Sequence, residues 1–554
     1  MGRLTDVGRG SGLSLAGEPI LDARLYSAIV MMVTLTTLVT PPALKWRFGA
    51  APPRRWSPRY ATITAVNWPK TLTLALILEV AGTGCGGSGL TSPSSPTGTP
   101  TPAPVATAKP NIVFVLIDDG EEAMSALMPR LRADFIDKGV RFTNAFSTTP
   151  LCGPSRANIL TGQFAHNTGV LANTGDNGGY LAFMAGGFDN NNIGPWLKAA
   201  GYKTGIFGKY ENDFPIGAPE TFIAPGWDDW RVVMSDRVGY NDEYTLNENG
   251  VLKLYTAATG GYQTDILSER MQSFIKSTEA NDSQPFFAFL AVAAPHTPTA
   301  PATRHLNAYP GATAPRTAAF NEADISDKPR WFQDQSPLMD GATIAELDSD
   351  YRGSLQALLA VEEAMDALFQ TLDQLGESSN TYVFFTSDNG LHRGEHRLRG
   401  GKNTAYEESI KVPFYVRGPG VPAGRTIEHL TGLVDLVPTF LTLAGASIPA
   451  SVDGVSLTPL LSSTPPALSA WRPDLLIEHP KGAGLPIQIP GYYGVRTQTE
   501  MYVEYDNGEN EYYDLRTDPL QLSNLAGQSP SSTIARLSAR VAALRRCKGA
   551  SCRP

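Results

Sequence analysis

Cysteine is scarce in this sequence of 554 residues, which contains four of them and no paired C-x-x-C spacing. The count excludes a fold built on disulfides, and the spacing excludes a paired-cysteine zinc site. Basic residues are also in the minority, with 45 Lys and Arg against 54 Asp and Glu and a formal net charge of −9. Such a chain repels polyanions, so nucleic acid is not expected among its partners. The 42% of hydrophobic residues suffices for a large core in more than one domain.

Long apolar runs are missing as well, and the first of two N-terminal runs, residues 25–39, is short for a membrane span. The second, residues 72–81, follows Lys70 and leads into a Gly-rich stretch around Cys85, as in a signal peptide and its cleavage zone. Cys85 is placed as in a bacterial lipoprotein processing site; a simple export signal or a single membrane anchor are the alternatives. Each version predicts an exported protein, either extracellular or a cell-surface lipoprotein tethered to the membrane through Cys85.

Composition also divides the remaining chain. Residues 88–109 are rich in Ser, Thr, Pro and Gly and have almost nothing to bury, which predicts a flexible linker. After Gly445, short strand patterns and an amphipathic helix pattern indicate a smaller α+β part. The predicted parts are an N-terminal extension with the signal- or lipoprotein-like segment (1–87), the linker (88–109), the main domain (110–445), a C-terminal subdomain (446–546) and a tail (547–554).

Two further segments give local predictions. Residues 303–350 are rich in Pro, Asp and Ala with weak periodicity, and we expect a long surface excursion near the mouth of a site. Residues 355–375 have apolar side chains at helical spacing, which predicts a helix that faces the core. Cys547 and Cys552, five residues apart, could close a small loop in an oxidising compartment; two unpaired thiols are the alternative.

Polar residues follow directly after several predicted buried strands. Residues 111–117 form a continuous apolar, β-branched run, as expected for a strand of a parallel sheet that is buried on both faces. The alternation of such runs with helical patterns predicts an α/β fold. Ligand sites in open α/β sheets form beyond the carboxyl ends of the strands, so the polar residues there should converge. They are Asp118 and Asp119, Lys209, His296, and Asp388 with Asn389.

The acidic and amide side chains in this set suit a metal ion. Asp118, Asp119, Asp388 and Asn389 offer only oxygen ligands, which Ca²⁺ and Mg²⁺ prefer. A single Asp pair is more often a solvated turn. Two pairs behind two buried strands favour a metal, because neighbouring carboxylates would otherwise repel one another.

Residues 151–162 contain a cysteine placed beside unpaired backbone N–H groups. Pro154 can start a helix, so Cys152 would lie at a helix N-terminus with the positive charge of Arg156 in the first turn. This pattern indicates an anion site with a nucleophile in it, and a buried structural cysteine is the alternative. Lys209 and Lys402 could add positive charge, and His296 could donate or accept a proton, although each could also be a surface residue.

These residues together resemble the sulfatase family. Residues 152–156, read as Cys-Gly-Pro-Ser-Arg and followed by Leu-Thr-Gly at 160–162, are similar to its signature, and the other motifs follow in family order from about 110 to 526. Within the family the chain looks closest to the N-acetylglucosamine-6-sulfatase-like and arylsulfatase branch. The resemblance implies an alkaline-phosphatase-like α/β sandwich. Its large mixed, mostly parallel central sheet would be flanked by helices, beside a smaller C-terminal α+β domain with an antiparallel sheet.

The resemblance also implies a mechanism. A formylglycine-generating enzyme would convert Cys152 into formylglycine, whose hydrated aldehyde attacks the sulfur of a sulfate monoester. Asp118, Asp119, Asp388 and Asn389, with position 152, would hold Ca²⁺, with Mg²⁺ as the alternative. Arg156 would hold the hydrated aldehyde, and Lys209 and Lys402 would neutralise the sulfuryl oxygens. His296 is one candidate for the base that deprotonates the second hydroxyl and expels sulfate; alternatively, Lys402 or His296 would protonate the leaving group.

The substrate would be a carbohydrate sulfate or an aryl sulfate. We expect substrate contacts from His166, Asn212 and His392; for the two histidines an ordinary loop position is the alternative. One departure from the family stands at Glu211, where many sulfatases carry a His two residues after the motif Lys. Two other functions remain open: a phosphonate or phosphate ester hydrolase with the same modified residue, and a non-catalytic surface protein that binds sulfated glycans and keeps Cys152 unmodified.

Overall fold

A computed structural model describes residues 14–15, 18–19, 109–234, 243–256, 261–280, 284–298, 300–480 and 488–553. The signal-like segment, Cys85 and the linker up to residue 108 lie outside these residues. The chain divides into two compact units, residues 1–100 and 101–554. In the first, β1 (Ser14–Leu15) pairs with β2 (Glu18–Pro19). Within the described ranges, no helix combines the length and the apolar character that a membrane crossing requires.

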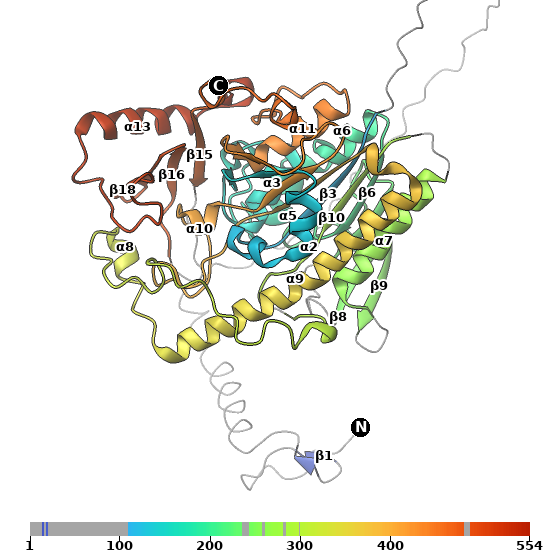
Figure 1. The fold of residues 1–554 in the computed structure, drawn as a ribbon, viewed down its shortest axis with the longest axis horizontal. Coiled ribbons are helices and arrows are strands. Elements are labelled where there is room, and N and C mark those ends of the chain that lie inside the picture. Colours follow the sequence, from blue (N-terminus) through green and yellow to red (C-terminus); the bar gives the residue numbers. More distant parts are fainter. Residues whose placement is uncertain are drawn as a thin grey trace, which may run out of the picture. The chain divides into compact units, whose positions relative to one another are not determined.

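A mixed sheet of ten described strands forms the centre of the second unit (Figure 1). The strands are β3 (Asn111–Ile117), β4 (Val140–Phe142), β6 (Lys203–Gly208), β7 (Asp229–Val233), β8 (Glu243–Glu248), β9 (Val251–Thr256), β10 (Phe286–Ala291), β11 (Thr381–Ser387), β12 (Phe414–Arg417) and β13 (Arg425–Ile427). Their order is β13-β4-β12-β11-β3-β10-β6-β7-β8-β9. The run from β11 to β7 is parallel, and antiparallel pairing begins at β12 on one side and at β8 on the other. A separate short pair joins β5 (Ala145–Phe146) to β14 (Thr431–Gly432).

Helices cover both faces of this sheet. Every residue of the central strand β3 is at most 2% exposed, and its alternate side chains enter two different hydrophobic cores. On one face lie α3 (Cys152–Thr161), α5 (Gly179–Ala185), α6 (Ile193–Ala199) and α11 (Leu436–Leu443). On the other lie α2 (Pro129–Leu131), α7 (Gln263–Glu279) and α9 (Gly341–Leu375), the last two side by side in Figure 1. The continuous apolar strands are therefore explained by burial on two sides, as the sequence predicted.

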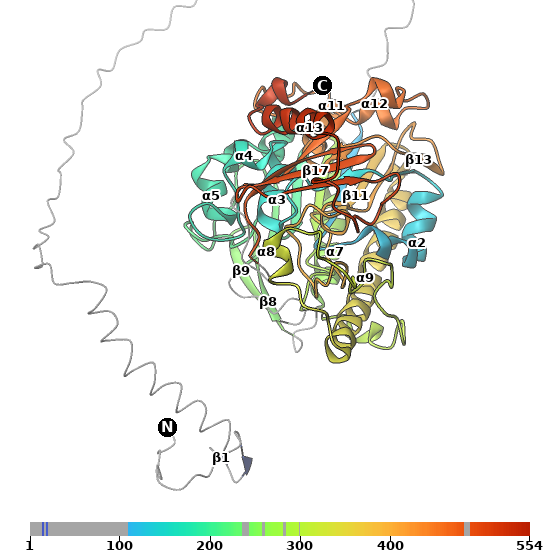
Figure 2. The same cartoon turned by 90° about the vertical axis from the view of Figure 1, so that its left-hand side faces the viewer.

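A smaller antiparallel sheet follows in the C-terminal part. It comprises β15 (Asp474–His479), β16 (Tyr492–Thr497), β17 (Glu500–Tyr505) and β18 (Asn510–Asp514), with α13 (Ser531–Leu544) packed against β16 and β17 (Figure 2). Cys547 and Cys552 form a disulfide after α13, which confirms the closed loop. The division at residue 445 stays a prediction.

Short helices and turns complete the unit. The short α-helices are α4 (Ala165–Thr168), α8 (Arg330–Gln333), α10 (Glu407–Ile410) and α12 (Thr458–Leu461). The 3₁₀ turns are η1 (Glu122–Leu127), η3 (Phe188–Asn190), η6 (Thr303–His305), η7 (Glu377–Ser379), η8 (Leu433–Asp435), η9 (Leu468–Ala470) and η10 (Gly549–Cys552), and η2 (Arg132–Ile136) is a π-helical turn.

The prediction for residues 303–350 is partly wrong. The helix expected from residue 355 begins at Gly341, where the Asp340 side chain accepts a hydrogen bond of 2.8 Å from the Thr343 N–H. Of residues 341–350 only Leu347 is buried, so the apolar period that reveals a helix is missing there. In addition, Trp331 and Phe332 of α8 are buried in the C-terminal core, so the segment is more than a surface excursion.

Candidate active site

Cys152 opens helix α3, as predicted, and its side chain is only 1% exposed. The Nζ of Lys402 lies 2.7 Å from the Cys152 Sγ, and the Sγ lies 3.6 Å from Oδ1 of Asp118. Burial raises the pKa of the Cys152 thiol to about 12, although Lys209 and Lys402 oppose the shift. The encoded residue is therefore a neutral thiol near pH 7 and a poor nucleophile.

Arg156 joins the ends of two strands of the central sheet. From the first turns of α3, its Nη2 lies 3.1 Å from Oδ2 of Asp118 after β3 and 3.0 Å from Oδ2 of Asp388 after β11. Its Nη1 donates a hydrogen bond of 2.9 Å to the Lys209 carbonyl. All three ion-paired side chains are at most 1% exposed. Since β3 and β11 are parallel neighbours, their carboxyl ends meet here, as the sequence predicted.

Two lysines neutralise the aspartate pair, and a histidine lies beside it. The Lys209 Nζ lies 2.7 Å from Oδ2 of Asp118, and Lys402 forms an ion pair with Asp119. The His296 Nε2 lies 3.6 Å from Oδ2 of Asp119. Burial raises the pKa of Asp118 and Asp119, but the charges around them, above all Lys209 for Asp118 and Lys402 for Asp119, hold both below their usual range. Both carboxylates are therefore ionised at neutral pH.

The hydrogen bonds of Asn389 indicate whether the predicted metal ligands fit a cation. Its Nδ2 donates a hydrogen bond of 2.6 Å to Oδ1 of Asp119, whereas its Oδ1 is buried and has no hydrogen-bond partner among the described residues. Burial and the charge of Asp118 raise the pKa of Asp388, so this carboxyl is not fully compensated by the protein. A divalent cation would satisfy both groups. Ligand atoms of Asp118, Asp119, Cys152 and His296 also lie within 4.8 Å of one another.

The three predicted substrate residues are not brought into contact with this cluster. His166 on α4 interacts with Glu478 and with the Cys547 carbonyl, at 2.9 Å in each case. His392 is fully buried, and its Nε2 lies 2.7 Å from the Thr404 Oγ1. The Asn212 carbonyl accepts a hydrogen bond of 2.7 Å from Tyr180 N–H, and the Asn212 Oδ1 is buried without a partner in the described ranges. Their roles toward substrate stay predictions.

Two serines hold the cluster together and were not singled out from the sequence. Ser155 donates to the Asp388 carbonyl. Ser387 accepts a hydrogen bond of 2.7 Å from the Gly120 N–H and donates one of 2.8 Å to the Asn389 carbonyl. Both occur inside the motifs, as the neighbours of Arg156 and Asp388, and this proximity was the available signal.

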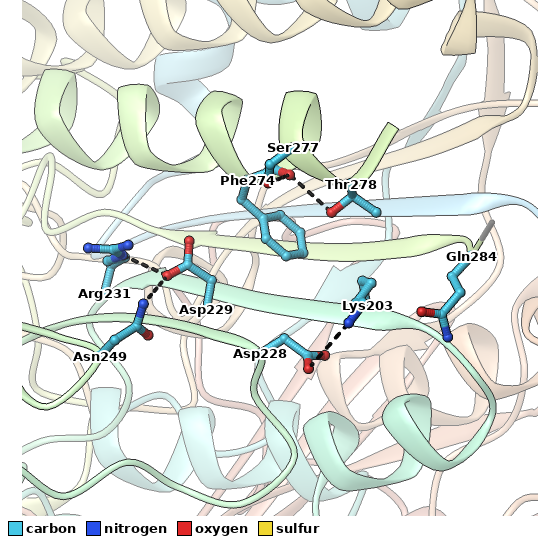
Figure 3. A pocket seen from close by; sticks show the side chains of 9 residues that line it. All are labelled: Lys203, Asp228, Asp229, Arg231, Asn249, Phe274, Ser277, Thr278 and Gln284. Carbon is cyan, nitrogen blue, oxygen red and sulfur yellow. Dashed lines mark hydrogen bonds and ion pairs between the residues drawn. The ribbon is translucent and has the colours of Figure 1, made fainter. Parts of the chain in front are cut away.

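A cavity of about 750 Å³ lies at the opposite edge of the sheet (Figure 3). Its lining includes the residues at which β6 and β7 begin. A strand with the length of β6 spans about 17 Å, so the cavity lies about that far from the carboxyl end of β6. Its charges compensate one another, since Lys203 pairs with Asp228 at 3.9 Å and Arg231 with Asp229 at 2.6 Å. Neither of the cations among the described residues that line the cavity is therefore free to hold an anion.

Comparison with known protein families identifies the family of this chain. The family model described as Sulfatase matches residues 110–446. The chain belongs to the sulfatase family. A second model, described as the C-terminal part of N-sulphoglucosamine sulphohydrolase, matches residues 394–546 of this sulfatase.

Individual relatives agree with this assignment. The sulfatase is 33% identical over 484 residues to N-acetylglucosamine-6-sulfatase from Capra hircus, which covers 80% of this chain and 85% of that enzyme. It is 34% identical over 381 residues to an extracellular sulfatase homologue from Caenorhabditis elegans, which covers 67% of this chain but only 52% of that longer protein.

A solved structure supports both the fold and the reaction class. It is described as a complex with its substrate D-glucosamine-2-N,6-O-disulfate, and it matches with a TM-score of 0.67 and 26% identity over 78% of this chain and 97% of that one. The predicted alkaline-phosphatase-like sandwich with a C-terminal antiparallel sheet is confirmed. The predicted sulfuric ester hydrolase activity is supported by the family and its named members.

Proposed function

We propose that this sulfatase removes the 6-O-sulfate from a sulfated glucosamine residue of a glycan, with a formylglycine made from Cys152. The observation that carries the proposal is the buried cluster in which Lys402 contacts Cys152 while Arg156 joins Asp118 to Asp388. The names of two similar enzymes, N-acetylglucosamine-6-sulfatase and the one bound to D-glucosamine-2-N,6-O-disulfate, support the choice of sugar.

Formylglycine at position 152 would supply, as its hydrate, a hydroxyl nucleophile toward sulfur. Arg156 orients position 152, because its guanidinium is fixed by two carboxylates and one carbonyl. Lys209 and Lys402 bind the sulfuryl oxygens and stabilise the negative charge that moves toward the leaving oxygen. His296, with its Nε2 facing the cluster and 23% of its side chain exposed, transfers a proton to the leaving alcohol.

A divalent cation, with Ca²⁺ proposed over Mg²⁺, would be held by Asp118, Asp119, Asp388 and Asn389, together with position 152. The oxygen-only protein donors and the unsatisfied Oδ1 of Asn389 support this choice. When bound, the cation would add positive charge where the sulfate sits.

We further propose that the protein is exported and matures with the help of a formylglycine-generating enzyme. The Cys547–Cys552 disulfide supports export, because such bonds persist in oxidising compartments. The Cys85 lipoprotein site and the membrane tether rest on the sequence pattern alone.

The test is a substrate panel with protein made in cells that contain a formylglycine-generating enzyme. We expect turnover of 6-O-sulfated glucosamine and slower turnover of 4-nitrophenyl sulfate. A preference for the matched phosphate or phosphonate esters would contradict the proposal in favour of the phosphohydrolase alternative. Intact-peptide mass spectrometry across Cys152 is the second measurement: an unmodified thiol in native-host protein, with sulfated-glycan binding but no turnover, would favour the non-catalytic alternative.

A further inference from the structure

Glu211 is a buried carboxyl group that the proposed reaction does not use. It stands two residues after Lys209 and is 0% exposed. Its Oε1 accepts a hydrogen bond of 2.9 Å from the Asn212 N–H, whereas its Oε2 is buried and has no hydrogen-bond partner in the part of the chain that the structure describes. An ionised carboxylate left in this condition is unfavourable, which favours the neutral acid.

The carboxyl lies against the backbone that presents position 152. A Cβ atom at Gly153 would lie 3.2 Å from Oε1 of Glu211, 3.2 Å from Oδ1 of Asn173 and 3.0 Å from the Ala172 carbonyl. The Gly153 N–H already donates a hydrogen bond of 2.8 Å to Oδ1 of Asn173. Glu211 therefore lies close beside the first turn of α3.

The charged and titratable groups around Glu211 come from three elements: Arg156 on α3, Lys209 and Tyr210 on its own loop, and Asp388 after β11. Burial raises the pKa of Glu211 to about 8. The hydrogen bond from the Asn212 N–H and the charges of Arg156 and Lys209 only partly oppose this shift, and Asp388 adds to it. The guanidinium of Arg156 already contacts Asp118, Asp388 and the Lys209 carbonyl. An ionised Glu211 would add a negative charge close to Lys209, which binds the sulfate, and to Arg156, which orients position 152.

We propose that Glu211 is a positioning residue of the sulfate site that acts in its neutral form: it supports Gly153 and adds no negative charge beside Lys209, which binds the sulfate, or Arg156, which orients position 152. Loss of its proton places a negative charge in the wall of an anion site and weakens sulfate binding. This inference rests on the proposed function and assigns a role to the position at which the chain departs from many sulfatases.

The test compares the wild type with Glu211→Gln, which keeps the size and the Asn212 contact but cannot ionise. Inorganic sulfate binding is measured by calorimetry between pH 6.5 and 9.5, with kcat/KM for 4-nitrophenyl sulfate alongside. We expect the wild type to bind sulfate about tenfold more weakly at pH 9 than at pH 7, and the variant to lose less than threefold. Equal pH profiles for the two proteins would overturn the inference.

Glu362→Gln is the matched control, because Glu362 is another buried glutamate that accepts hydrogen bonds from backbone N–H groups, at 2.9 and 3.1 Å, away from the cluster. It should keep the wild-type pH profile, and a flattened profile would also overturn the inference. If Glu211→Gln does not fold, the wild type alone decides, since sulfate affinity that is constant from pH 7 to 9 contradicts the proposal. Absence of turnover with normal sulfate binding would refute the proposed function instead.

Discussion

The amino group of Lys402 lies 2.7 Å from the sulfur of Cys152 and forms an ion pair with Asp119. One side chain thus contacts both the proposed nucleophile position and the proposed cation site. Lys402 is only 10% exposed, so its charge is poorly screened by water. Burial alone would lower the pKa of Lys402, but Asp119 and the neighbouring anionic groups hold it well above its usual value.

Replacing Lys402 should therefore remove charge stabilisation in the transition state. We expect Lys402→Met to lower kcat/KM for a sulfate ester by at least about a hundredfold, the usual cost of losing one such group. Lys138→Met is the control, because Lys138 is 53% exposed in a surface pair with Asp134. A Lys402→Met enzyme within threefold of the wild type would remove Lys402 from the mechanism.

Cation removal should destabilise the folded protein as well as inactivate it. A ligand that binds only the native state contributes about 2.7 kcal/mol at one hundred times its dissociation constant. We expect a chelator to lower the melting temperature, and Ca²⁺ to restore it. After chelator treatment, Asn389→Leu and the wild type should have similar melting temperatures. Added Ca²⁺ should raise the melting temperature of the variant less than that of the wild type. Full recovery in the variant would show that the Oδ1 of Asn389 is not a ligand.

The disulfide after α13 should stabilise the C-terminal part. Its loop is short, and chain entropy predicts a contribution of about 2 kcal/mol. Cys552→Ser should lower the free energy of unfolding by that amount, measured by urea denaturation without reductant. Reductant should bring the wild type to the same value and leave Cys552→Ser unchanged. Equal stabilities of oxidised and reduced wild type would contradict the prediction.

The pair of His166 and Glu478 predicts a pH-dependent stability. Both ring nitrogens of His166 face acceptors, the Glu478 carboxylate and the Cys547 carbonyl, which suits the doubly protonated ring. Burial lowers the pKa of His166, but the hydrogen bond to Glu478 outweighs this and raises it above 6.5. The stabilisation is therefore complete below about pH 6.5 and disappears as pH rises through the folded-state pKa.

Unfolding free energies of the wild type and His166→Gln should accordingly differ more at pH 5.5 than at pH 9. His305→Gln serves as the comparison, since His305 pairs with Glu363, which is 35% exposed, at 3.3 Å. A difference for His166→Gln that does not change with pH would indicate packing alone.

Much of this site could be predicted because its residues directly follow buried strands. The apolar runs before Asp118 and Asp388 fixed the strands, and parallel pairing then placed the two aspartates at one edge of the sheet. His166 could not be placed in this way, because its partners Glu478 and Cys547 are more than 300 residues away and lie in the C-terminal part. The start of α9 was missed because its first turns face solvent and carry no apolar period.

The burial of Cys152 determines whether its proposed conversion can follow folding. Its side chain is 1% exposed, and every residue of α3 is buried beneath the surface. A second enzyme cannot reach that sulfur once the strands have paired and Arg156 has joined Asp118 to Asp388. The proposed conversion of Cys152 must therefore come before folding, so the rate at which the chain folds would set the time available for it.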